Sequence, residues 1–124
     1  MAVDSFPEVK AGLEGRSERV IDEQLLTRHV GGRGIFATPA MIGLMEMTAH
    51  RSLEPLIPDG YTTVGYEVHV RHLAPSRPGA TIVVTTKVTS VEGRKVAFEV
   101  ACYDGEKLVG SGMHKRAIVP APED

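Results

Sequence analysis

The stretch Thr38–Leu53 reads TPAMIGLMEMTAHRSL, and the predicted architecture is built around it. Thr38 stands directly before Pro39, whose fixed φ suits the first helical position, and a threonine hydroxyl is a good N-cap. The sequence therefore predicts a helix that starts at Thr38, runs through Leu53 and stops before the prolines at 55 or 58. Its first turns are apolar almost all round, which is typical of a buried helix.

Strands are expected both before and after this helix in the sequence. We predict a first strand over 17–28, where apolar and charged residues mix. Next comes VGGRG (30–34), whose glycines favour a mobile loop that covers the helix start. After the helix, β-branched and alternating segments joined by the turn sequences EGR (92–94) and DG (104–105) predict antiparallel hairpins. The later strands are expected over 62–73, 81–91, 95–103 and 107–119.

One buried helix followed by an antiparallel meander, with one strand before it, is an α+β plan in which the sheet wraps the helix. The 124 residues are expected to form one domain, because they fall below the roughly 150 residues used as a prior for a domain. We expect residues 1–16 to be an N-terminal extension and residues 120–124 a tail. A small sheet leaves exposed edges, so a two-fold homodimer, or a larger assembly, is expected to pair them.

Composition argues against several classes of function. Fourteen basic and sixteen acidic residues give a net charge of −2, Trp is absent, and there are only three Tyr and three Phe, so no nucleic-acid partner is expected. The sequence has no apolar run of about 18 residues and no secretory signal, which predicts a soluble, cytoplasmic protein without a membrane partner. The single Cys102 excludes an internal disulfide, and the five histidines lack ligand spacing, so no metal is expected.

Glu46 is the first candidate for chemistry, because it lies in the apolar part of the helix beside Met45 and Met47. One interpretation is structural: carboxylates are rarely buried without a partner, so the side chain turns to solvent. The other interpretation is catalytic, with the carboxylate held in a dry site as a general base or nucleophile. The sequence alone leaves both open.

His72 is the second candidate, because alternation along 62–73 places it on the side that faces the helix. It is either a satisfied core residue or, opposite Glu46, one half of an acid–base pair. Without a bulge, the residues on the same side are Val64, Tyr66, Val68 and Val70.

Thr38 is the third candidate. As an N-cap it contributes about 1 kcal/mol to the helix, but a helix N-terminus also offers free N–H groups and a partial positive charge to a developing oxyanion. The run HKR (114–116), with Arg71 and Arg77, is either a solvated face or a phosphate site. The glycine-rich loop lacks the G-x-G-x-x-G and P-loop patterns, so no nucleoside triphosphate or dinucleotide site is predicted.

With these residues in place, the chain resembles hotdog-fold acyl-CoA thioesterases, most of all the fluoroacetyl-CoA thioesterase-like branch. The resemblance extends from about residue 19 to 119, and the family's catalytic threonine, glutamate and histidine match Thr38, Glu46 and His72 at spacings of 8 and 26 residues. The stretches that carry it are FATPAMIGLME (36–46), TVG (63–65), VRHLA (70–74), VEGR (91–94) and GSGMHKRA (110–117).

The resemblance implies a hotdog fold, a homodimer with active sites along its interface, and hydrolysis of a short- or medium-chain acyl-CoA to free acid and CoA. No cofactor is implied, since CoA is part of the substrate. The sequence departs from that branch at HVGG (29–32), where the branch has two lid phenylalanines, so we do not expect fluoroacetyl specificity. The resemblance assigns catalysis to Thr38, Glu46 and His72, and substrate binding to Gly65, Phe36 and Arg116.

Two other functions are compatible with a hotdog fold. The main alternative is a non-catalytic domain that binds acyl-CoA or CoA as a sensor. A hotdog hydratase is less favoured, because that family's arrangement of Asp and His is not found in this sequence.

Overall fold

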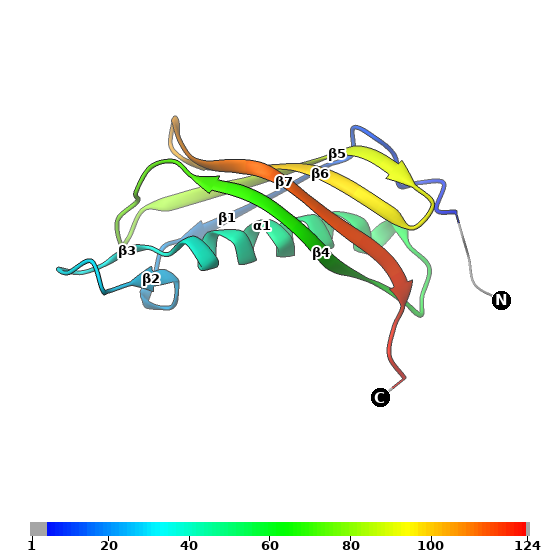
Figure 1. Cartoon of the computed structure of the whole chain (residues 1–124), viewed down its shortest axis with the longest axis horizontal. Coiled ribbons are helices and arrows are strands. Elements are labelled where there is room, and N and C mark those ends of the chain that lie inside the picture. Colours follow the sequence, from blue (N-terminus) through cyan, green and yellow to red (C-terminus); the bar gives the residue numbers. More distant parts are fainter. Residues whose placement is uncertain (1–4, 124) are drawn as a thin grey trace.

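The computed structural model describes residues 5–123, which form a curved antiparallel sheet wrapped around a long helix (Figure 1). The strand order is β1-β5-β6-β7-β4, and the helix lies along the concave side of the sheet. This arrangement confirms the predicted α+β plan, but the predicted meander holds only for β5, β6 and β7, because β4 pairs with β7 instead of with β5. The elements are β1 (Glu14–Val20), η1 (Glu23–Leu25), β2 (Leu26–Thr27), β3 (Ile35–Phe36), α1 (Thr38–Leu53), η2 (Glu54–Leu56), β4 (Tyr61–His72), β5 (Thr81–Glu92), β6 (Lys95–Asp104) and β7 (Lys107–Pro120).

Helix α1 starts at Thr38 and ends at Leu53, as the sequence predicts. The predicted cap is wrong, because Ala37 occupies the N-cap position and no side chain caps the helix. Thr38 is already the first helical residue, so its hydroxyl is not placed to accept from the free N–H groups as an N-cap side chain does. That hydroxyl is therefore available for another partner.

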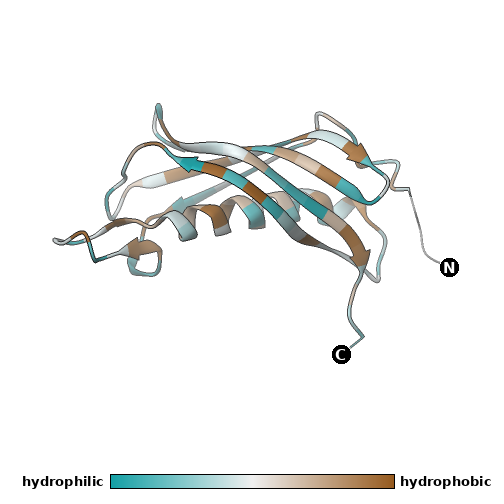
Figure 2. Cartoon of the chain, viewed as in Figure 1, coloured by the Kyte–Doolittle hydropathy of each residue, from teal (hydrophilic) through white to brown (hydrophobic). Residues whose placement is uncertain are grey.

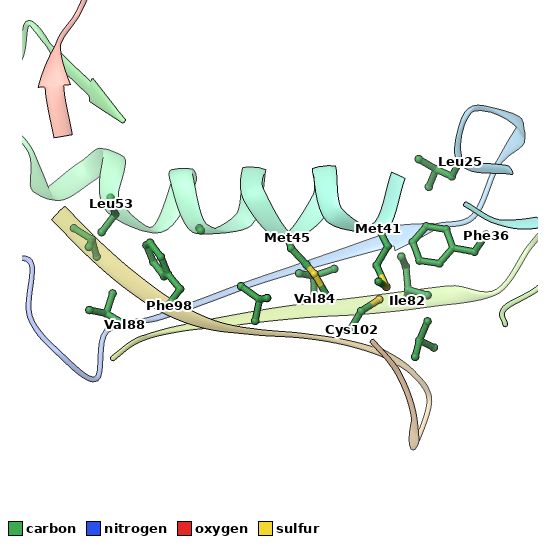
Figure 3. Packing of buried hydrophobic residues seen from close by; sticks show 14 of the residues in the cluster. Leu25, Phe36, Met41, Met45, Leu53, Ile82, Val84, Val88, Phe98 and Cys102 are labelled. Atoms are coloured by element: carbon green, nitrogen blue, oxygen red, sulfur yellow. The ribbon is translucent and has the colours of Figure 1, made fainter. Parts of the chain in front are cut away.

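Only one side of α1 is buried within the single chain. Met41, Met45, Ala49 and Leu53 recur every fourth residue, and each is at most 1% exposed. Figure 3 shows Met41 and Met45 pointing from α1 toward the side chains of the sheet. On the other flank Met47 is 46% exposed. The predicted burial therefore holds for the sheet-facing side of the helix.

Strands β5 and β6 supply much of the core opposite the helix. Buried and more exposed residues alternate along both strands, as they do when one face of a sheet is covered, and Figure 2 shows the matching hydropathy bands. Both predicted hairpins are confirmed: β6 pairs with β5 and with β7. The buried core residues of these two strands are Ile82, Val84, Val88, Val96, Phe98, Val100 and Cys102.

Strand β4 corrects part of the predicted face assignment. A β-bulge between Gly65 and Glu67 shifts its register against β7. Before the bulge, Val64 is 46% exposed, and at the bulge Tyr66 is 48% exposed, so neither faces the helix as expected. A bulge reverses the sides of a strand because it adds one residue to a two-residue repeat.

Beyond the bulge the predicted sides hold. Val70 packs against the core, and His72 lies two residues further on the same side of β4. Before the bulge it is Thr63 that is buried, at 5% exposed. The bulge therefore lets polar residues at both ends of β4 face the same helix.

The predicted strand over 17–28 is wrong at both ends. Strand β1 instead starts at Glu14 and ends at Val20. It ends there because Oδ1 of Asp22 accepts from the N–H of Gln24 and caps the short turn η1 that follows. The chain then forms the β2–β3 hairpin. Its glycine-rich loop extends past the start of α1 instead of folding over it (Figure 1).

Candidate active site

The start of α1 and the end of β4 meet in a hydrogen-bonded pair. Oγ1 of Thr38 lies 2.7 Å from Nδ1 of His72. Phe36 packs edge-on against the imidazole, with ring centroids 5.9 Å apart and an interplanar angle of 80°. Because Phe36 is 1% exposed, this contact fixes the orientation of the His72 ring.

His72 is suited to act as a neutral base. Burial lowers the pKa of its imidazole, so the ring is uncharged near neutral pH. Its Nε2 atom is buried and has no hydrogen-bond partner within residues 5–123. A buried polar atom of this kind is a place where a further group is expected to bind. The hollow beside it measures about 260 Å³ and is lined by Ile35, Thr38, His72, Leu73, Ala74 and Pro75.

Glu46 belongs to a second polar group, further along α1. The eight residues from Thr38 to Glu46 correspond to about 12 Å of helix. Oε2 of Glu46 lies 3.9 Å from Nη1 of Arg116, and the Glu46 side chain is 38% exposed. Gly65 of β4 makes this approach possible, because a Cβ at that position would lie 2.9 Å from Oε2 of Glu46.

Arg116 of β7 is fixed by several neighbours. Its Nε donates to Oγ1 of Thr63 at 2.8 Å, and its Nη2 donates to the Thr63 carbonyl oxygen at 3.0 Å. Its Nη1 lies 3.5 Å from the Glu46 carbonyl oxygen. Burial lowers the pKa of the guanidinium, and the carboxylate of Glu46 opposes that effect. Arg116 therefore holds a positive charge against both the backbone and the side chain of Glu46.

His114 also holds the guanidinium of Arg116 in place. Its Nδ1 donates to the Glu67 carbonyl oxygen at 2.9 Å, so Nε2 is the acceptor for Nη1 of Arg116 at 3.2 Å. Burial lowers the pKa of His114, and stacking on Phe98, with centroids 6.1 Å apart, holds the ring. The neutral form of His114 is required, because a protonated Nε2 would oppose the Arg116 donor.

Thr63 extends this network to the far end of α1. Since its hydroxyl oxygen accepts from Arg116, its proton is directed to Nδ1 of His50, 2.6 Å away. Nε2 of His50 then carries the ring proton and donates to Oε2 of Glu54 at 3.1 Å. A continuous hydrogen-bonded chain thus connects Arg116 with the C-terminal end of the helix.

The structure places the predicted site residues in two groups. Thr38, His72 and Phe36 form the first group, and Glu46, Gly65 and Arg116 form the second. No hydrogen bond or ion pair joins the two groups in the described part of the chain. Sequence reasoning did not single out Thr63 or His50, and it treated His114 only as part of a basic run. The bulge in β4 turns Thr63 inward, and the single Gly65 inside this strand is the sequence signal that could have predicted it.

The part of the chain that the structure describes contains no metal-binding cluster, no reactive cysteine and no membrane-spanning helix. No cluster of three or more His, Cys, Asp or Glu that could hold a metal ion occurs among residues 5–123. Burial, with Asp104 adding to it, raises the pKa of the Cys102 thiol to about 11, so this cysteine is not a nucleophile at neutral pH. No helix in that same part of the chain is long and apolar enough to cross a membrane.

Comparison with known proteins gives a consistent result. The family described as fluoroacetyl-CoA-specific thioesterase matches residues 14–122. The fluoroacetyl-CoA thioesterase of Streptantibioticus cattleyicolor is 40% identical over 85 residues, which are 68% of this chain and 61% of that protein. The alignment thus spans less than two thirds of the curated relative.

Solved structures agree on the fold. The fluoroacetyl-CoA thioesterase FlK superposes with a TM-score of 0.84 at 32% identity, covering 90% of this chain and 89% of that one. A variant of FlK in complex with fluoroacetate and CoA gives the same TM-score and identity, covering 90% of this chain and 96% of that one. A hot-dog-like protein from Thermanaerovibrio acidaminovorans, at 24% identity, has a TM-score of 0.81 over 90% of this chain and 84% of that one. The predicted hotdog fold is confirmed.

Proposed function

We propose that this chain, which belongs to the family of fluoroacetyl-CoA-specific thioesterases, hydrolyses acyl-CoA thioesters to the free acid and CoA. The observation that carries the proposal is the 2.7 Å hydrogen bond between Thr38 and His72 at the N-terminus of α1. Free N–H groups and the partial positive charge of this terminus stabilise negative charge on the thioester carbonyl oxygen. The neutral imidazole of His72 can accept or return a proton during the reaction.

Hydrolysis of the thioester needs a nucleophile but little assistance to the leaving group. Water adds to the carbonyl carbon, the carbon–sulfur bond breaks, and CoA leaves as a thiolate, which departs readily because an ordinary thiol has a pKa of about 8.5. Glu46 takes the proton from water as a general base, or attacks first and forms an anhydride that water then opens. In this proposal no cofactor takes part, since CoA is a portion of the substrate.

A homodimer explains how Glu46 reaches the reacting carbon. Within one chain, about 12 Å of helix separate Glu46 from Thr38, too far for both to act on one carbonyl group. Among residues 5–123, strand β4 pairs with β7 alone and is the last strand of its sheet. Antiparallel pairing of two copies of β4 would join the sheets and cover the open flank of α1 near Met47. In this dimer the partner subunit's Glu46 lies against Thr38 and His72.

A mixing experiment tests the shared site. Thr38→Val and Glu46→Gln subunits, each inactive alone, form mixed dimers in which one of the two sites has an intact set. Recovery of about a quarter of the wild-type activity is expected after subunits are exchanged. If each chain carries its complete set, every site retains one substitution and no activity returns, which would reject the shared arrangement.

The acyl group is proposed to be short or of medium length. The hollow beside Thr38 and His72, at about 260 Å³, is smaller than the usual range for drug-sized ligands. Because the loop over residues 29–32 carries no phenylalanine, we expect no marked preference for fluoroacetyl-CoA over acetyl-CoA.

A panel of acyl-CoAs tests the function. Purified protein is incubated with acetyl-, fluoroacetyl-, butyryl- and hexanoyl-CoA, and released CoA is measured with a thiol reagent. If the wild type releases more CoA than the Glu46→Gln variant does, the protein is a thioesterase. Binding of acyl-CoA without release would instead support the sensor alternative.

A cytoplasmic location stays a prediction from the sequence, which cell fractionation tests.

A further inference from the structure

Two loops meet beside the Thr38–His72 pair and carry arginines that the reaction does not use. Arg33 comes from the glycine-rich loop between β2 and β3, and Arg77 from the loop between β4 and β5. The two loops lie at the same end of the molecule (Figure 1). They line an open hollow of about 400 Å³, which lies within the usual size range for ligand pockets. The hollow is lined by Gly31, Arg33, Gly34, Ile35, Arg77 and Pro78.

This hollow has positive charge that nothing in the described chain compensates. Its lining contains two arginines and no carboxylate. No ion pair or side-chain hydrogen bond engages Arg33 or Arg77 within residues 5–123, although the chain as a whole has a net charge of −2. Lys107, in the adjoining hollow, differs: it lies 3.7 Å from Asp104 and donates to the Pro75 carbonyl oxygen. The two arginines are therefore free to bind an anion.

The backbone of the first loop suits a phosphate. Gly31 and Gly34 line the hollow and have positive φ angles of 94° and 91°. A Cβ added at Gly31 would meet nothing within 4 Å, so the backbone there is open to an approaching group. Guanidinium groups bind phosphate oxygens in a bidentate manner, and glycine lets those oxygens come close to the main chain.

The hollow is continuous with the site of the reaction. Ile35 lines it, the adjoining hollow and the hollow beside Thr38 and His72. Arg33 is five residues from Thr38, and Arg77 is five residues from His72. The two Cα atoms in each of these pairs therefore lie at most about 18 Å apart. An extended molecule can therefore lie across Ile35 with one end at His72 and a charged end between the loops.

We infer that Arg33 and Arg77 form a phosphate subsite that binds the nucleotide phosphates of CoA while the thioester lies at Thr38 and His72. This inference rests on the proposed function. Both arginines come from the same chain as the Thr38–His72 pair, so the subsite does not depend on how two subunits pair.

The test compares substrates with and without phosphate. Wild type, Arg33→Ala, Arg77→Ala and the double variant are assayed with an acyl-CoA and with the matching acyl-pantetheine, which lacks the nucleotide. For the acyl-CoA, we expect KM to rise about tenfold for each arginine removed, with kcat changed by less than about twofold. KM for the acyl-pantetheine should not change. Lys10→Ala, an exposed change near the N-terminus, is the control with the same loss of charge.

Equilibrium binding separates the possible failures. Calorimetry with CoA, 3′-dephospho-CoA and pantetheine needs no turnover. Weaker binding of CoA to the double variant, with unchanged binding of pantetheine, supports the subsite even if no acyl-CoA is hydrolysed, in which case the proposed function alone fails. Equal binding of CoA to wild type and the double variant, or equal effects on acyl-CoA and acyl-pantetheine, would overturn the subsite and leave the proposed function standing.

Discussion

The Thr38 hydroxyl lies 2.7 Å from Nδ1 of His72 and joins the first residue of α1 to the last residue of β4. The Thr38 side chain, which the sequence predicts to cap the helix, is instead bonded to His72 on the edge strand of the sheet. Ala37 is the N-cap residue, without a side-chain bond to the helix. The start of the helix therefore relies on Pro39, which presets the backbone, while Thr38 holds the imidazole in place.

Removal of the Thr38 hydroxyl should affect turnover more than stability. Thr38→Val keeps the shape of the side chain, but the imidazole of His72 loses its only hydrogen-bond partner in the described chain. We expect kcat to fall about 100-fold, with a thermal midpoint close to that of the wild type because no cap is lost. Thr38→Ser should restore most of the rate. A large drop in the midpoint with full activity would show that the hydroxyl has a structural role.

Substitution of Glu46 tests the carboxylate. Glu46→Gln keeps the size of the side chain and removes its charge, so kcat should fall at least about 100-fold. The fold should persist, because the side chain is 38% exposed. Circular dichroism and steady-state kinetics check both expectations, and Glu99→Gln on the exposed side of β6 is the control. Full activity of Glu46→Gln would remove this residue from the mechanism.

Gly65 permits the close approach between β4 and Glu46. In Gly65→Ala the new methyl group would lie 2.9 Å from Oε2 of Glu46 and 2.9 Å from Cε1 of His114, so those side chains must move. A misplaced carboxylate should lower kcat about tenfold or more, with a smaller effect on KM. Kinetics of the purified variant measure this split. An unchanged kcat would mean that the observed position of Glu46 is not required for turnover.

Stability should decrease on the acid side of neutrality. Burial lowers the pKa of both His72 and His114 from the ordinary value of 6.5, so below that pH the unfolded chain binds more protons than the folded one. The free energy of unfolding should therefore fall as the pH drops below 6.5 and through the lowered values. Denaturant unfolding at several pH values measures it.

His114→Gln provides the matched comparison for this pH dependence. It removes one of the two histidines, so its stability should vary less steeply with pH on the acid side. Gln24→Ala, an exposed change that removes no titratable group, should leave the slope unchanged. Identical slopes for wild type and His114→Gln would show that His114 does not contribute.

The sequence by itself determined the helix, the two hairpins and the α+β class. Proline at position 39, apolar residues every fourth position in α1, and the EGR and DG turns are local signals, and each acts within a few residues of itself. For this reason α1 begins at Thr38 and ends at Leu53, as the sequence predicts. The family resemblance, which rests on matching local segments, belongs to this category as well.

Only the tertiary structure decided which polar residues meet. The bulge between Gly65 and Glu67 turns Thr63 inward, and Arg116 reaches Glu46 because β7 pairs with β4, which lies more than 40 residues away in the chain. The loops that bring Arg33 and Arg77 together are likewise distant in sequence. Contacts of this kind depend on strand register and packing, which are set by the whole sheet and leave no periodic signal in any one segment.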